Sequence, residues 1–235
     1  MGGAVDELAR VLGRIESQLD EGLYRPGPWA EFLRAAEGRP RPERLMLADQ
    51  TSRVSDKLHR RGHPLAFSFW MGLSLELIAT VVALMLLEVG LRGPSGGCVL
   101  AAAIVFTVTL QPLIKLAVGH LLGVRYSYFY IWGYYEPRFK MRYGTYLCAD
   151  RWRRVLLHLS GTVGSPLAFW WVSVRAAEAV PRVSAICEGL FWLLVGVQVL
   201  TFLLGISGVR RLARVGWMTS GGAVARELRA LTSST

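Results

Sequence analysis

Residues 66–91 read AFSFWMGLSLELIATVVALMLLEVGL, and this apolar stretch decides the fold. It exceeds the roughly 17–25 residues that a helix needs to cross the hydrocarbon core of a bilayer. Three more stretches of membrane length follow at 98–124, 155–174 and 185–208. The sequence therefore predicts an all-α polytopic membrane protein with four transmembrane helices, in a membrane domain over residues 64–209.

The overall composition supports a membrane protein. Hydrophobic residues make up 52% of the 235 residues and charged residues 19%, the reverse of what disorder requires. Three cysteines without a C-x-x-C pair exclude a disulfide scaffold and a thiolate zinc ribbon. We expect Cys98, Cys148 and Cys187 to be free thiols, although Cys98 and Cys187 both lie near outer span ends, where a disulfide between them is conceivable.

The net charge of +10 is unevenly distributed along the chain. Residues 1–61 hold 11 Lys and Arg against 10 Asp and Glu, so the basic excess lies in the apolar remainder of the chain. Sixteen Lys and Arg lie in 53–61, 125–154 and 210–229, against three in the two short connections, Arg92, Arg175 and Arg182. By the positive-inside rule, we expect a multi-pass cell-membrane protein with both termini and the 125–154 loop in the cytoplasm, and no nucleic-acid partner.

Residues 1–63 are predicted to form a cytoplasmic helical region, and residues 210–235 a cytoplasmic C-terminal segment. Apolar residues at helical spacing predict a first helix over 5–23, ended by Pro26 to Pro28, and a second over 41–61. The two apolar sets are Leu8, Leu12, Ile15, Leu19 and Leu23, then Leu47, Val54 and Leu58. The balanced charge favours a cap packed on the membrane domain over the alternative, a helix that anchors to the membrane surface or docks a partner.

The 125–154 loop is rich in tyrosine, with seven of the eight tyrosines between residues 126 and 146. The runs 126–135 and 138–146 alternate in a β-prone pattern, which predicts a short membrane-associated β-hairpin. Tyr128 and Tyr130 are candidates for lining a client-binding groove, because an exposed strand pairs with extended segments. An aromatic belt with basic flanks is the structural alternative.

Polar residues inside the spans are the next candidates. A rise of about 1.5 Å per residue places Glu76, Lys115 and Gln198 at a similar depth from the cytoplasmic side. We predict a buried Glu76–Lys115 pair, either structural or functional, because each charge alone is costly in hydrocarbon. His120 and His158 also share a depth, and they are either half of a metal site or a helix–helix hydrogen bond.

Three segments taken in order resemble the site-2 protease family of intramembrane zinc metalloproteases. Residues 116–125, LAVGHLLGVR, resemble the family's H-E-x-G-H motif with the G-V-R that follows it. Residues 158–168, HLSGTVGSPLA, resemble its A-G-P-x-A-N element, and residues 217–228, WMTSGGAVAREL, resemble its L-D-G-G-R-x-L segment. The resemblance covers about residues 98–230 and implies a core whose motifs face the cytoplasm.

The residues at the family's metal-binding and catalytic positions are not kept in this chain. Position by position, the first metal-binding histidine corresponds to Leu116, the general-base glutamate to Ala117 and the metal-binding aspartate to Ser220. Only His120 matches a ligand. The resemblance therefore implies a pseudoprotease without a cofactor, which binds a transmembrane client or partner subunit in a groove with Gln198, Ser220, Tyr128 and Tyr130 as candidates.

Two other functions stay open. The first is an active intramembrane metalloprotease with an unorthodox zinc site that uses His120 and His158. The second is a small transporter or channel subunit in which Glu76, Lys115 and Gln198 line a polar path.

Overall fold

The structure is a computed structural model that describes residues 2–62, 65–132, 136–207, 223–225 and 227–228. Four of its helices are long and apolar enough to cross a membrane: α4 (Phe69–Arg92), α5 (Gly96–Leu121), α7 (Arg151–Ala176) and α8 (Pro181–Ile206). Each helix end lies within four residues of the predicted span. Apart from 223–225 and 227–228, the predicted C-terminal segment 210–235 lies outside the described residues.

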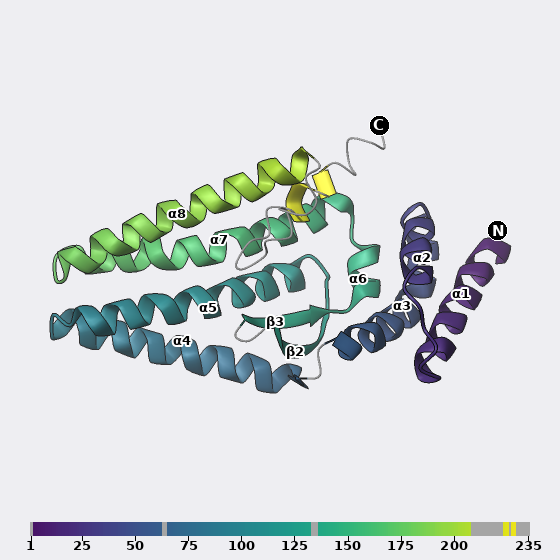
Figure 1. The fold of residues 1–235 in the computed structure, drawn as a ribbon, viewed down its shortest axis with the longest axis horizontal. Coiled ribbons are helices and arrows are strands. Elements are labelled where there is room, and N and C mark those ends of the chain that lie inside the picture. Colours follow the sequence, from purple (N-terminus) through teal and green to yellow (C-terminus); the bar gives the residue numbers. More distant parts are fainter. Residues whose placement is uncertain (1, 63–64, 133–135, 208–222, 226, 229–235) are drawn as a thin grey trace.

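The four long helices form two hairpins that pack side by side through α5 and α7. The short α4–α5 and α7–α8 connections lie together at one end of the molecule, whereas the sheet and the N-terminal helices lie at the other (Figure 1). Buried residues of all four helices make the core between them, including Ala83, Phe106, Val172 and Cys187. The three cysteines are free thiols, as predicted.

Small residues on α7 allow a close approach between the two hairpins. A Cβ atom on Gly164 would lie 2.6 Å from the Cα atom of Gln111 on α5. The neighbouring Ser165 hydroxyl donates to the Thr107 carbonyl at 3.3 Å, which connects the same two helices. The use of small residues at this interface, a common device in membrane helix pairs, brings Gln111 against α7.

The N-terminal region contains three helices, α1 (Gly2–Asp20), α2 (Pro28–Glu37) and α3 (Arg41–Gly62). The apolar face predicted for α1 is buried, with one exception: Leu23 is exposed because the helix ends at Asp20. The sequence pattern did not predict α2, which begins at Pro28, because proline ends one helix and is also favoured in the first turn of the next. Leu147 of α6 (Tyr143–Cys148) completes the apolar cluster of these three helices and joins them to the rest of the fold.

The predicted β-hairpin is a three-stranded antiparallel sheet in the order β1 (Ala66–Ser68), β2 (Tyr126–Trp132), β3 (Glu136–Met141). Residues 66–68 were wrongly assigned to the first span. They are apolar enough for a helix, but they pair with β2, with Phe67 opposite Phe129. The Ser68 hydroxyl then accepts a hydrogen bond from the Met71 amide at 3.2 Å and caps the start of α4.

The predicted second strand was also too long. It ends at Met141, and the alternating residues that follow it form α6 instead. The cause is a contact far along the chain: Gly144 packs closely against the Ala48 carbonyl of α3 and donates from its amide to the Ser52 hydroxyl at 3.0 Å. A residue with a side chain has no room at that contact.

Candidate functional site

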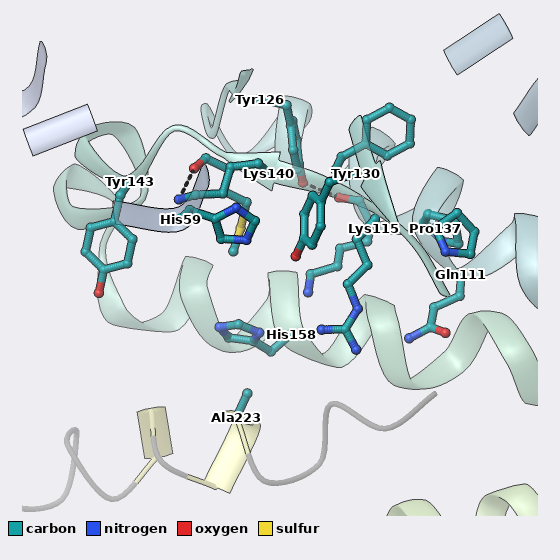
Figure 2. A pocket seen from close by; sticks show the side chains of 14 residues that line it. His59, Gln111, Lys115, Tyr126, Tyr130, Pro137, Lys140, Tyr143, His158 and Ala223 are labelled. Atoms are coloured by element: carbon teal, nitrogen blue, oxygen red, sulfur yellow. Dashed lines mark hydrogen bonds between the residues drawn. The ribbon is translucent and has the colours of Figure 1, made fainter. Parts of the chain in front are cut away.

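A cavity of about 390 Å³ lies between the sheet and the ends of α5 and α7 (Figure 2). Five consecutive residues of β3, 137–141, form part of its wall. Because successive side chains of a strand point to opposite faces, a wall of consecutive residues means that the cavity lies along the edge of β3. β3 is an outer strand of the sheet, where a proline such as Pro137 is tolerated because an amide on the outer side makes no ladder hydrogen bond.

Basic side chains from four elements line this cavity. They are His59 of α3, Lys115 of α5, Arg138 and Lys140 of β3, and His158 of α7. None of the described lining residues is Asp or Glu. Since lysine and arginine are charged at neutral pH, the lining carries positive charges from α5 and β3.

Lys140 fastens the sheet to α3. Its ammonium group donates to the Ser55 hydroxyl at 2.8 Å and lies 3.8 Å from Asp56 Oδ1. Burial lowers the pKa of Lys140, and the charge of Asp56 acts in the opposite direction. Burial also raises the pKa of Asp56, and the charge of Lys140 acts against this shift. Lys140 is therefore a structural cation of the cavity wall.

Tyr126 fastens β2 to α5 next to Lys115. Its hydroxyl donates to the Lys115 carbonyl at 2.7 Å, and the absence of a side chain at Gly119 makes room for the ring. Burial raises the pKa of Tyr126, so the hydroxyl keeps its proton. This contact fixes the stretch of α5 from which Lys115 lines the cavity (Figure 2).

A second cavity of about 340 Å³ shares Met141, Tyr143 and His158 with the first. Here the Tyr146 hydroxyl donates to Glu227 Oε1 at 2.8 Å and lies 3.0 Å from His158 Nε2. Because a hydroxyl has only one proton to donate, Nε2 must carry the proton of the second hydrogen bond. Burial and the charge of Glu227 raise the pKa of Tyr146.

Arg154 completes this network from α7. It is 3% exposed and lies 3.5 Å from Glu227 Oε2 and 3.4 Å from Glu37 Oε1. Its guanidinium carbon also lies 5.4 Å from the centre of the Tyr146 ring. The network ties α2, α6 and α7 to the short C-terminal stretch, and nothing in the local sequence pattern indicates it.

The structure brings some of the predicted site residues together. Lys115, Tyr130 and His158 line the first cavity, and Tyr130 packs edge-on against His59 with ring centres 4.4 Å apart. Tyr128 lies beside them, with its hydroxyl 2.9 Å from His59 Nδ1. Burial and Asp56 raise the pKa of Tyr128 to about 12.

The other predicted residues lie elsewhere. His120 is exposed on the last turn of α5, whereas His158 is buried, and Gln198 lines an apolar groove of about 490 Å³ between α7 and α8. Glu76 is buried on α4, and its Oε2 has no hydrogen-bond partner among the described residues. Ser220 lies outside the described residues.

Two of the predicted constellations stay predictions. The ion pairs between described residues do not include Glu76 with Lys115. No three His, Cys, Asp or Glu side chains in the described part of the chain are grouped so that they would hold a metal ion. His158 Nε2 is engaged by Tyr146, so a zinc ion at this residue would bind through Nδ1 or replace that hydrogen bond.

Arg138, Lys140 and His59 were missed as cavity residues. The basic character of the 125–154 loop was a signal for the first two, but only the sheet register and the packing of α3 place them in one wall. Comparisons of the chain with protein-family models, curated proteins and solved structures find no match.

Proposed function

We propose that this chain is a non-catalytic integral membrane protein with a site-2-protease-like core, which binds an extended segment of a membrane client or partner subunit along β3. The observation that carries the proposal is the position of β3, an edge strand of the sheet in the described part of the chain, beside the cavity. Strand addition uses main-chain hydrogen bonds of such an edge and takes specificity from the adjoining pockets.

The outer surfaces of the long helices support the membrane placement. Large apolar side chains are exposed along α4 and α8, among them Ile78 at 61%, Met85 at 62% and Trp192 at 62%. A soluble monomer rarely leaves so long an apolar surface in water. The two short connections lie at one end, and the charge distribution of the sequence supports a topology with that end outside the cell and the sheet in the cytoplasm.

Cysteine labelling tests this placement. In a variant without the three native cysteines, we expect Ser95→Cys and Glu178→Cys, in the two short connections, to react with a membrane-impermeant maleimide in intact cells. Asp49→Cys on α3 and Arg153→Cys at the start of α7 are expected to react only after the membrane is opened. The opposite pattern would reverse the proposed orientation, and equal labelling of all four positions in intact cells would exclude it.

Photo-crosslinking tests client binding. A benzophenone amino acid in place of Pro137 on β3 is expected to give a discrete adduct, in which the crosslinked residue lies in an extended segment flanking a membrane span of the client. The control carries the same amino acid in place of Ile78 on the outer face of α4. Identical adducts from both positions would contradict client binding at β3. A result in which residue 137 crosslinks only to lipid would contradict it as well.

A further inference from the structure

We propose that the basic cavity beside β3 binds the phosphate headgroup of an anionic membrane lipid. The inference rests on the membrane placement proposed above and not on client binding. It adds a ligand of defined chemistry to the cavity.

The position of the cavity along α5 matches the headgroup region. The 26 residues of α5 span about 39 Å at 1.5 Å per residue, longer than the roughly 30 Å hydrocarbon core. Lys115 lies about 9 Å from the helix end at Leu121 by the same rise. A centred helix therefore holds the Lys115 backbone close to the core boundary, and its long side chain reaches toward the phosphates.

The charge of the lining favours a phosphate. Lys115 of α5 and Arg138 and Lys140 of β3 bring positively charged groups to the lining, and Ser55 and Asp56 hold the ammonium group of Lys140. An arginine guanidinium donates two parallel hydrogen bonds to phosphate oxygens, and a lysine adds a point charge. The described lining offers no carboxylate that would repel an anion.

The remaining lining suits a headgroup joined to a glycerol backbone. Gln111, Tyr130 and Tyr143 add polar groups, and Pro112 and Met141 add apolar surface. The volume of about 390 Å³ lies within the range of roughly 300–1,000 Å³ usual for small-molecule sites. A free phosphate ion shares the charge but would leave the apolar part of the wall uncovered, so we assign the site to the lipid.

The test measures lipid binding to the purified full chain. Native mass spectrometry follows titrations with phosphatidylglycerol and with zwitterionic phosphatidylcholine. We expect one phosphatidylglycerol to bind in preference to phosphatidylcholine, and Arg138→Gln and Lys115→Gln each to weaken it about tenfold, the usual size of one charge-assisted hydrogen bond. Arg138→Lys keeps the charge and loses the paired donors, so its affinity is expected to lie between those of the parent chain and Arg138→Gln.

The matched control is Arg153→Gln, which removes one charge from the same end of α7 outside both cavities. Equal weakening by Arg153→Gln would mean that the whole surface attracts the lipid, and would overturn the site. Saturable binding of inorganic phosphate that displaces the lipid would assign the site to a soluble anion instead. Unfolding temperatures of the variants separate a lost contact from a lost fold, and the cysteine labelling above reports separately on the membrane placement.

Discussion

Replacing Arg154 with methionine is expected to lower the free energy of unfolding by about 3–5 kcal/mol, the usual cost of breaking a buried ion pair from one side. The side chain is 3% exposed and lies 3.5 Å from Glu227 Oε2, which is itself buried. Without the guanidinium, the Glu227 carboxylate keeps its hydrogen bond from Tyr146 but loses its cation. Urea unfolding of the detergent-solubilised chain, followed by tryptophan fluorescence, measures the change.

The preceding residue provides the control for this prediction. Arg153 keeps 36% of its side chain exposed, lies 3.7 Å from Asp150 Oδ2 and packs over the ring of Trp152. Because these contacts are local and solvated, Arg153→Met is expected to change stability by less than about 0.5 kcal/mol. Adding Glu227→Gln to Arg154→Met is expected to restore part of the loss, because a neutral amide still accepts from Tyr146. Equal losses from Arg153→Met and Arg154→Met, or no recovery in the double variant, would refute a buried pair.

The sequence predicts the elements whose cause is local. A span follows from the length of an apolar run, and each of the four helices lies where such a run is found. The apolar spacing of α1 is equally local, and its burial follows from it. By contrast, β1 forms because Ala66–Ser68 pairs with β2, which lies some sixty residues later in the chain. In the same way, α6 forms where Gly144 packs against α3. No pattern within either segment contains those partners.

The candidate site shows the same division. The depth of Lys115 and His158 along their spans predicted both as site residues, and both line the cavity. Depth alone does not fix the direction in which a side chain leaves its helix, so His120 lies on the surface and Gln198 lines a separate groove. The basic residues of β3 and α3 join the site through strand register and helix packing, which depend on the whole fold.

Replacing Gly164 with alanine is expected to destabilise the chain by about 2–3 kcal/mol, because the added methyl group meets main-chain atoms of α5 that have no rotamer by which to move away. The Cβ atom would lie 2.6 Å from Gln111 Cα and 3.0 Å from its amide nitrogen. The two hairpins would have to separate at this contact. Because Gln111 also lines the basic cavity, the same change is expected to weaken ligand binding there.

The sign of the change in stability shows whether the contact at Gly164 or the higher helix propensity of alanine dominates. Gly196 of α8 is also helical, but a Cβ atom there meets nothing within 4 Å, so Gly196→Ala is expected to stabilise the chain by up to about 1 kcal/mol. Both variants make the same chemical change in the same type of helix, and urea unfolding compares them directly. If Gly164→Ala proved as harmless as Gly196→Ala, α5 and α7 would not meet at this glycine. In that case Gln111 of α5 would not lie against α7, and the cavity that it lines would have a different wall.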